Sequence, residues 1–476
     1  MARELIGVGL SFMFVFMVLG VAAFAKKRGA HTETCRKLAH ILLSNWVIVA
    51  LFVFEQTWAV LIVPACFIVL NYYSYRKGTF SGIEREGDSA LGTVWYAVSL
   101  LVLCAVGWSL GVPWVAACGI LAMGYGDGFA TLVGIRWGKR PFPAPYSGKT
   151  LEGSLTVFVF SALCVGVLCL IFAPEIALPA AFAGGVAAMA GELYSSRGLD
   201  NLSLPLSVGL VVLLMLYFPE STLVLVYFAL TLFVLLAAFY LRSVSISGLH
   251  SATVVGTLLY FFGGLLSYLA VVLFFLAASF VSRVGKQRKA GAYSLHSRGG
   301  PRGAVQALAN TGPGLILAAG YYFSGQELFL LAVLASFSAA AADTFSSEIG
   351  MLSKTQPVSI LGFCKVERGL SGGVTPLGLC GGGLGSMVIA LLALPAFGWW
   401  GAAVVFLCGV LGSLLDSVLG AALQAKYRLP QGGLTERSVL GGRPLPLARG
   451  LAWVNNDFVN FASPLLCAGV CLLIVL

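Results

Sequence analysis

Acidic and basic side chains in the first half of the chain are of the types that could bind a metal-nucleotide complex. Asp127 stands in the glycine-rich segment 124–128 of an apolar stretch, and a basic loop leads from there to Ser-Gly-Lys-Thr at 147–150. Carboxylates hold Mg²⁺, while bases and glycine-rich backbone N–H groups hold phosphates. An ionisable residue inside an apolar helix is costly unless it is paired or hydrated, so Asp127 is a functional candidate.

These residues divide by expected role. The catalytic candidates are Asp127, as a metal ligand or base, Lys149 and Glu152. The phosphate-binding candidates are Arg36, Lys37, Lys139, Arg140, Ser147 and Gly148. The metal candidates are Asp127, Glu192, Asp200 and Asn201. Three alternatives stay open: Asp127 could cap or pair helices, Lys149 and Arg140 could be surface charges, and His40 could be either a base or an interfacial residue.

The Ser-Gly-Lys-Thr sequence does not predict a P-loop. That motif needs glycine at the position of Pro143, and it follows a strand of a parallel sheet. A different kind of phosphate site is therefore expected.

The second half carries a comparable set. Asp343 and Glu348 close one apolar stretch, Asp416 lies inside another, and Asn456 with Asp457 opens the last. We expect Asp343, Glu348 and Asp416 to be catalytic, and we expect a metal to be held by Asp343, Asp416, Asn456 and Asp457. Phosphate binding is expected of Arg302, Lys354, Arg368, Gly372 and Gly373. In a continuous helix Asp343 and Glu348 would point about 140° apart, so they share a metal only if the helix breaks there. The alternative for these acids is polar contact between helices.

The elements that position these residues must be membrane helices. Of the 476 residues, 59% are hydrophobic and 10% charged, which excludes a soluble enzyme and a disordered chain. Continuous apolar runs exclude a transmembrane β-barrel, where apolar and polar residues alternate. We predict an all-α polytopic integral membrane protein with about sixteen spans in two bundles. The two spans predicted at 252–264 and 265–283 could instead form one helix.

Charge gives the expected orientation. The net charge is +10, and every Lys and Arg except Arg3 lies on one side if the first helix starts outside. This bias predicts an outer amino terminus and sites on the cytoplasmic side of the plasma membrane. Dispersed bases also argue against a nucleic-acid partner. The polar loops form two sets, which predicts domains at 1–242 and 243–476. The eleven cysteines show no metal-ligand spacing.

The first half resembles the family of phytol kinases and dolichol kinases, which are CTP-using membrane lipid kinases. The resemblance rests on Arg36, Lys37, His40, Glu84, Arg85, Gly92, Thr93, Tyr96, Gly126, Asp127, Gly128, Gly138, Lys139, Lys149, Glu152, Gly153, Ser154, Glu192, Asp200, Asn201 and Pro205. It implies transfer of a nucleotide γ-phosphate to a long isoprenoid alcohol.

The second half resembles a family of membrane proteins that includes phytyl phosphate kinases. The resemblance rests on Arg302, Gln306, Ala309, Asn310, Ala342, Asp343, Thr344, Ser347, Glu348, Ile349, Gly350, Lys354, Gly369, Gly372, Gly373, Val374, Gly378, Gly412, Ser413, Asp416, Gly420, Asn456, Asp457, Asn460 and Phe461. Where the family often has Gly-Thr-Asn-Gly-Gly, this chain has Gly-Leu-Ser-Gly-Gly at 369–373, so the role of Ser371 stays open.

Together the two resemblances imply a natural fusion of two lipid kinases. The first half would phosphorylate a prenyl alcohol such as phytol or geranylgeraniol, and the second would convert the monophosphate to the diphosphate. Mg²⁺ and CTP or another nucleoside triphosphate are the expected cofactor and phosphate donor. A cytidylyltransferase that makes a CDP-lipid, and a lipid transporter or flippase, remain alternatives. The oligomeric state stays open.

Overall fold

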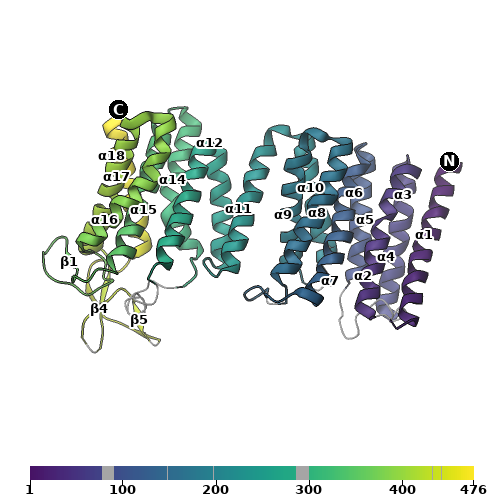
Figure 1. Ribbon diagram of the computed structural model, residues 1–476, viewed down its shortest axis with the longest axis horizontal. Coiled ribbons are helices and arrows are strands. Elements are labelled where there is room, and N and C mark those ends of the chain that lie inside the picture. The colour runs from purple at the N-terminus through teal and green to yellow at the C-terminus, as the bar shows by residue number, and fades with distance from the viewer. Residues whose placement is uncertain are drawn as a thin grey trace. The chain divides into compact units, whose positions relative to one another are not determined.

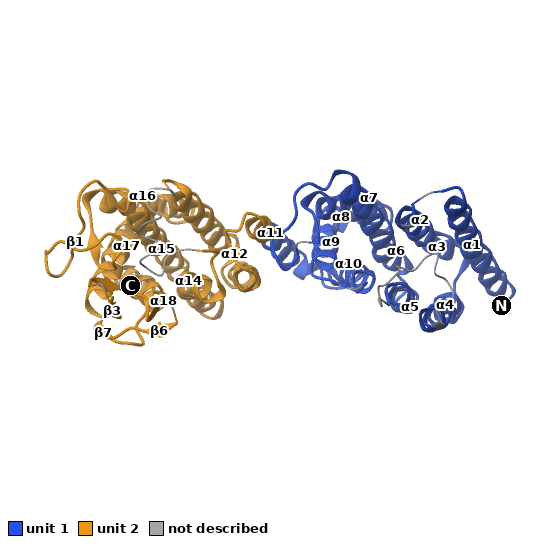
Figure 2. Ribbon diagram, turned by 90° about the horizontal axis from the view of Figure 1, so that it is seen from below, with its two compact units in different colours: residues 1–233 blue, residues 234–476 orange. Residues whose placement is uncertain are grey.

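The structure, a computed structural model, describes residues 1–29, 31–77, 91–146, 148–196, 198–285, 300–430, 432–440 and 442–475. Its apolar stretches are helical, which confirms the all-α membrane class (Figure 1). The chain forms two compact units, unit 1 at 1–233 and unit 2 at 234–476 (Figure 2). The division falls inside one helix, Thr222–Tyr240, nine residues before the boundary expected at 242.

Unit 1 is built from helices joined by short connections. They are α1 (Ala2–Lys27), α2 (Thr32–Ser44), α3 (Trp46–Val53), α4 (Thr57–Lys77), α5 (Gly92–Ser109), α6 (Pro113–Leu121), the π-helical turn η1 (Ala122–Asp127), α7 (Gly128–Trp137), α8 (Leu151–Phe172), η2 (Pro174–Ile176), α9 (Ala177–Leu193), α10 (Asp200–Tyr217), η3 (Pro219–Ser221) and α11 (Thr222–Tyr240). Helix α2 packs on α1, η1 and α7, whereas α4 packs on α1 and α5. Two walls therefore face each other, with α1 closing one edge.

Unit 2 has longer helices and small β-hairpins in its polar loops. The helices are α12 (Ile246–Arg283), α14 (Ala304–Ser324), α15 (Leu328–Gly350), α16 (Pro376–Ala390), η4 (Leu391–Ala393), α17 (Leu394–Ala422) and α18 (Asn456–Val475). The antiparallel strands are β1 (Val358–Ser359) with β2 (Gly373–Val374), β3 (Lys426–Arg428) with β4 (Leu434–Thr435) and β7 (Leu447–Arg449), and β5 (Val439–Leu440) with β6 (Arg443–Pro444). These short strands were not predicted from the sequence.

Thirteen of the described helical segments are long and apolar enough to cross a membrane. Two of them turn back on themselves at a glycine with positive φ, Gly264 in α12 and Gly398 in α17. Arg283 at the end of α12 donates to Ser243 Oγ at 3.0 Å, so the two halves of α12 run antiparallel. Helix α12 is thus a helical hairpin, and its turn at Gly264 lies at the boundary between the two spans expected at 252–264 and 265–283. The total of about sixteen spans stays a prediction.

Small residues let the helices of unit 2 approach closely. Residues 331–342 of α15 are all buried, and the glycine-rich face of α16 packs on this helix. A Cβ at Gly385 would lie 2.5 Å from the carbonyl oxygen of Ala341, and a Cβ at Gly381 would lie 2.9 Å from Ile349 Cβ. In a bilayer such packing replaces the hydrophobic effect as the force between helices.

One capping arrangement recurs where a loop enters a membrane helix. The side chains of Thr150, Ser245 and Thr375 each accept a hydrogen bond from the glycine N–H three residues later, at 3.0–3.2 Å. Each cap satisfies one of the donors left open in the first turn of a helix. The cap at Thr150 fixes the start of α8, and thereby the loop that carries Lys149.

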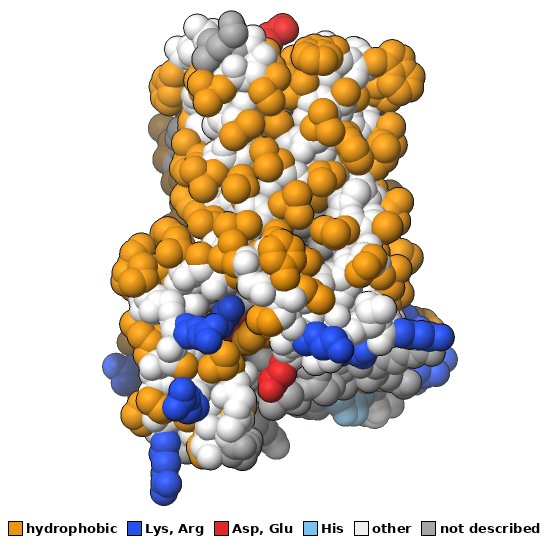
Figure 3. Space-filling model, turned by 90° about the vertical axis from the view of Figure 1, so that its left-hand side faces the viewer, with side chains coloured by type: hydrophobic (Ala, Val, Ile, Leu, Met, Phe, Trp, Pro, Cys, Tyr) orange, Lys and Arg blue, Asp and Glu red, His pale blue; other side chains and the backbone are white. Residues whose placement is uncertain are grey.

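Charge is segregated on the face of unit 2 drawn in Figure 3. Apolar side chains cover its tall part, and Lys and Arg gather at one end. This distribution agrees with the confirmed membrane class, since the apolar band suits lipid and the charged end suits water.

We expect Gly385→Ala to destabilise unit 2. The new Cβ would overlap the Ala341 carbonyl of α15, and overpacking of this kind costs about 1–3 kcal/mol. Thermal unfolding in detergent measures the effect. Gly383→Ala is the matched control, because a Cβ there meets no atom within 4 Å. Equal melting temperatures for the two variants would contradict the close packing of α15 and α16.

Candidate functional site

The central feature of unit 1 is an ion pair between Lys37 of α2 and Asp127 at the end of η1. Lys37 Nζ donates to Asp127 Oδ2 at 2.6 Å, and the two side chains are only 5% and 8% exposed. Two charges held inside an apolar bundle need each other, because either one alone would carry a large desolvation cost. The pair therefore ties α2 to η1 across 90 residues of sequence.

The glycines around Asp127 serve this helix contact. A Cβ at Gly124 would overlap Ser44, one at Gly126 would lie 2.6 Å from Ser161 Oγ, and one at Gly128 would overlap Ile41. Glycine thus lets η1 approach both α2 and α8. The structure thus gives these three glycines a role in close helix packing. A π-helical turn at this point is also typical of functional sites in helices.

His40 lies one turn after Lys37 and faces the same carboxylate. Its Nε2 is 3.6 Å from Asp127 Oδ2, and its ring meets the Tyr96 ring of α5 edge-on at 4.8 Å. Of the two roles left open by the sequence, the structure therefore places His40 in the site rather than at the interface. Tyr96, which the sequence indicated only through the family resemblance, contacts the His40 ring.

A second set of charges comes from the loop that precedes α8 and from helices α9 and α10. Lys149 Nζ bonds to Glu192 Oε1 and lies 4.0 Å from Asp200 Oδ2. Burial alone would lower the pKa of Lys149, but Glu192, Asp200 and Asp127 outweigh burial and raise this pKa above its ordinary value. Lys149 is therefore a firmly charged base next to two metal candidates.

Arg36 is the remaining base of this region on α2. Its Nε donates to Glu33 Oε2 at 3.0 Å, one turn earlier on the same helix. The sequence analysis did not single out Glu33. Glu33 could have been predicted as a partner of Arg36, because a spacing of three residues places an acid and a base on the same face of a helix.

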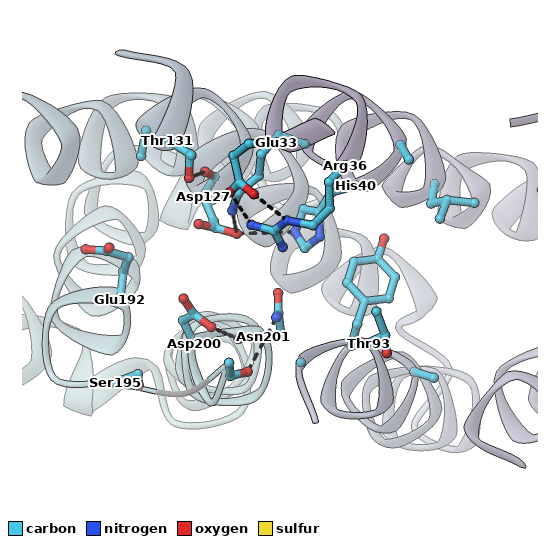
Figure 4. A pocket seen from close by; sticks show the side chains of 18 of the residues that line it. Glu33, Arg36, His40, Thr93, Asp127, Thr131, Glu192, Ser195, Asp200 and Asn201 are labelled. Atoms are coloured by element: carbon cyan, nitrogen blue, oxygen red, sulfur yellow. Dashed lines mark hydrogen bonds and ion pairs between the residues drawn. The ribbon is translucent and has the colours of Figure 1, made fainter. Parts of the chain in front are cut away.

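These side chains surround one cavity of about 1190 Å³. Figure 4 shows Arg36, His40, Asp127 and Thr131 on one wall, with Thr93, Asp200 and Asn201 opposite. Pockets for a single drug-sized ligand measure roughly 300–1,000 Å³. This cavity therefore has room for a second ligand beside the first.

Several buried polar side-chain atoms along the cavity have no hydrogen-bond partner among the described residues. In the part of the chain that the structure describes, no hydrogen bond reaches His40 Nε2, Tyr96 OH, Ser154 Oγ, Glu192 Oε2 or Asn201 Oδ1. All five residues line the cavity. Buried polar groups normally have partners, so a concentration of open ones marks a place that a polar ligand or water completes.

Other predicted residues of the first half lie apart from this cavity. Glu152 Oε2 accepts a hydrogen bond from the backbone N–H of Arg140 at 3.3 Å, so it ties the end of the basic loop to α8. Neither Glu152, Arg140 nor Lys139 is among the residues that line the cavity, whereas Gly148 is. Ser147, with Glu84 and Arg85, lies outside the described residues. The predicted roles of these residues stay predictions.

In unit 2 the predicted acids lie on three helices. Asp416 of α17 is buried and accepts a hydrogen bond from Ser463 Oγ of α18 at 3.1 Å. Glu348 accepts one from Ser282 Oγ of α12 at 3.1 Å. Helix α15 continues without a break through Asp343 and Glu348 to Gly350, so the break that would let them share a metal is absent. Asn456 and Asp457 open α18, as expected.

The bases and glycines of unit 2 serve several local contacts. Arg368 Nη2 donates to the carbonyl of Lys354 at 3.0 Å, and Arg302 pairs through its backbone with Ser243 and Ser245. A Cβ at Gly372, which has positive φ, would lie 2.5 Å from Ala421, and a Cβ at Gly373 in β2 would lie 2.8 Å from Val366 Cγ2. Both glycines thus have a structural reason to be glycine, beside the predicted phosphate contact.

Ser371 meets two charged residues that the sequence analysis missed. Its N–H donates to Glu436 Oε1 at 2.7 Å, and its carbonyl accepts from Lys426 Nζ at 3.0 Å. Burial lowers the pKa of Lys426. Only the tertiary fold brings these residues together, because they lie 55 and 65 residues from Ser371 in the sequence.

Among the described residues, no group of three His, Cys, Asp or Glu side chains could by itself hold a metal ion. This arrangement still suits Mg²⁺, which is usually held by one or two carboxylates together with substrate phosphates and water. Glu192 and Asp200, on either side of Lys149, are the described carboxylates that offer such a partial site.

Several curated proteins are similar to somewhat less than half of this chain. A phytol kinase from Synechocystis sp. (strain ATCC 27184 / PCC 6803 / Kazusa) is 32% identical over 210 residues, which cover 43% of this chain and 90% of the relative. Protein PGR of Arabidopsis thaliana is 30% identical over 256 residues, covering 47% and 86%. The chloroplastic protein VTE6 of the same plant is 28% identical over 240 residues, covering 48% and 65%.

No solved structure gives a significant match to the chain. The profile of the family described as integral membrane protein DUF92 matches residues 229–468, which is half of the chain and nearly all of unit 2. The chain therefore belongs to the integral membrane protein DUF92 family and is a relative of phytol kinase.

Proposed function

We propose that the protein is a bifunctional membrane isoprenoid kinase. Unit 1 transfers the γ-phosphate of a nucleoside triphosphate, CTP or another, to the hydroxyl of a prenyl alcohol such as phytol or geranylgeraniol. Unit 2 phosphorylates the resulting monophosphate to the diphosphate. The active sites lie on the cytoplasmic side of the plasma membrane, and the amino terminus lies outside.

One observation carries the first step: the Lys37–Asp127 pair, His40 and Lys149 line one cavity of unit 1. The cavity has fixed charge for a nucleotide and open polar atoms for a hydroxyl. The printed name of the Synechocystis relative supports the choice of a phytol-like alcohol. A prenyl alcohol also suits a cavity inside a membrane bundle, because its tail can stay among apolar groups.

The chain's own residues have separate tasks in this reaction. The alcohol oxygen attacks the γ-phosphorus, the bond from that phosphorus to the β–γ bridging oxygen breaks, and the nucleoside diphosphate leaves. His40 Nε2 accepts the hydroxyl proton, and the nearby Asp127 carboxylate stabilises the imidazolium. Lys37 holds Asp127 in place, so Asp127 acts here through charge and position.

The nucleotide phosphates are bound from the opposite side of the cavity. Lys149 supplies positive charge there, Arg36 adds a second base from the wall of His40, and Glu192, Asp200 and Asn201 would hold Mg²⁺. The open Oε2 of Glu192 and Oδ1 of Asn201 fit such a cation, since both are oxygen ligands. A magnesium ion held there would supply positive charge against the negative charge that develops on the phosphate oxygens.

For the second step the support is less direct. Unit 2 coincides with the matched family region, and its acids Asp343, Asp416 and Asp457 lie on neighbouring helices α15, α17 and α18. Asn456 would add an oxygen ligand for Mg²⁺, and Arg302, Lys354 and Arg368 would bind phosphate. Because the substrate already carries a phosphate, this unit needs bases for two phosphorylated ligands.

We expect Asp127→Ala to abolish alcohol phosphorylation and Asp343→Ala to abolish diphosphate formation, each leaving the other step intact. Removal of one preorganised charge from a reaction site typically lowers the rate by about 10²–10³-fold. The assay uses purified full-length protein, Mg²⁺ and each nucleotide in turn, with geranylgeraniol or its monophosphate, and products are identified by mass. Diphosphate formation by Asp343→Ala would refute the role given to unit 2.

The same assay separates the alternative functions. A nucleotide labelled at the γ-phosphate gives labelled prenyl phosphate if the protein is a kinase. A cytidylyltransferase would instead place CMP in the lipid. Lipid movement in proteoliposomes without nucleotide, together with no labelled product, would favour a transporter.

A double-mutant cycle separates folding from chemistry at the ion pair. We expect Lys37→Met alone to destabilise unit 1 by roughly 3–5 kcal/mol, because Asp127 is left buried without its cation. Lys37→Met combined with Asp127→Leu should be more stable than either single variant, yet inactive. The measurement is thermal or denaturant unfolding beside the phosphorylation assay. Additive losses of stability would show that the two charges do not depend on each other.

A further inference from the structure

The cavity of unit 1 continues beyond its polar residues into an apolar part. Six side chains of two helices line this part, which we name the apolar arm: Val15, Phe16 and Leu19 of α1, and Val63, Phe67 and Leu70 of α4. The polar residues described above need no such extension to bind a nucleotide. The cavity as a whole therefore fits a ligand that is polar at one end and apolar along the rest of its length.

Contacts between helices connect the arm to the reacting groups. Asn71 Nδ2 of α4 donates to the carbonyl of Thr93 at the start of α5, at 2.9 Å. Tyr96 is one turn further along α5, and its ring contacts His40 at 4.8 Å. The path along α4 from Val63 to Asn71 covers about 12 Å at the rise of a helix. A ligand with its hydroxyl at His40 and its chain along α4 would thus fill both parts.

Part of the arm's lining also reaches the outer apolar surface of unit 1. Val15 and Val63 are buried, but Phe16 is 59% exposed and Leu70 is 44% exposed. Phe16 and Phe67 lie 6.5 Å apart between ring centres, and Phe12 adjoins both.

We propose that the apolar arm holds the isoprenoid chain of the substrate alcohol and sets the chain length that unit 1 accepts. This inference rests on the proposed function, since it names the place of the alcohol in that reaction. The hydroxyl lies between Tyr96 and His40, and the nucleotide lies on the side of Lys149, Glu192 and Asp200. The two ligands thus approach the phosphoryl-transfer point from opposite ends of one cavity.

The arm selects by shape rather than by hydrophobic affinity. Lipid tails are as apolar as leucine, so a prenyl chain gains little by moving from the bilayer into the arm. A side chain that blocks the arm, however, excludes long chains and leaves short ones unaffected. Steric differences of this size in a binding pocket typically change selectivity by about 10–200-fold.

The test narrows the arm at one position on α1 and one on α4. We expect Leu19→Trp and Val63→Phe each to raise the ratio of kcat/KM for farnesol over geranylgeraniol by roughly 10-fold or more. Val21→Trp on α1 and Val69→Phe on α4 are the matched controls, because both valines are exposed and neither lines the cavity. The same ratio in all five proteins, wild type included, would overturn the proposal.

A second measurement needs no turnover and so separates this inference from the proposed function. Full-length protein in detergent is irradiated with geranylgeraniol that carries a diazirine at its tail end, and labelled peptides are mapped. Labelling of α1 and α4 that unlabelled geranylgeraniol prevents supports the arm, even if no nucleotide is consumed. Scattered labelling that unlabelled alcohol does not reduce overturns the arm, even if the protein proves to be a kinase.

Discussion

The buried ion pair between Lys37 and Asp127 is the interaction on which the geometry of unit 1 depends. In an apolar bundle neither charge is tolerable alone, so the pair fixes where α2 lies against η1. That position brings His40 to the same carboxylate and leaves a space toward α5, α9 and α10. The desolvation cost that makes such a pair rare in membranes also makes its geometry precise, because any separation of the partners is strongly unfavourable.

The lipid environment imposes a second constraint that both units meet in the same way. Helices there associate through close contact of small residues, and glycine appears wherever two backbones must approach. Gly124 and Gly128 let η1 and α7 meet α2, and Gly385 lets α16 meet α15. The glycines beside Asp127 thus position the site by admitting close helix contacts, and a glycine-rich sequence in a membrane protein can serve helix packing as well as phosphate binding.

The helices and the importance of Asp127 could be predicted from the sequence, because both follow from local patterns. Apolar length defines a span, and Asp127 is conspicuous within one. Its partners could not be predicted, since Lys37 lies 90 residues away and Lys149 bonds to Glu192 across 43 residues. Proximity in sequence does not decide which bases line the cavity either: Arg140 follows Asp127 closely in sequence, yet it is not among the lining residues. Which bases reach the acid is set by helix packing, for which a single sequence holds no local signal.

The bilayer changes what a lipid-binding cavity has to provide. In water an apolar pocket gains affinity from every methylene it buries, about 0.8 kcal/mol each, but a pocket inside a membrane competes with a solvent that is equally apolar. For the proposed alcohol, binding energy must then come from the polar end, where His40 and Tyr96 have open polar atoms for a hydroxyl that the bilayer core cannot solvate. The apolar arm contributes alignment and exclusion instead. On the proposed function, a cavity with fixed charges at one end and an apolar arm at the other would therefore recognise the alcohol group strongly and the tail only by its fit.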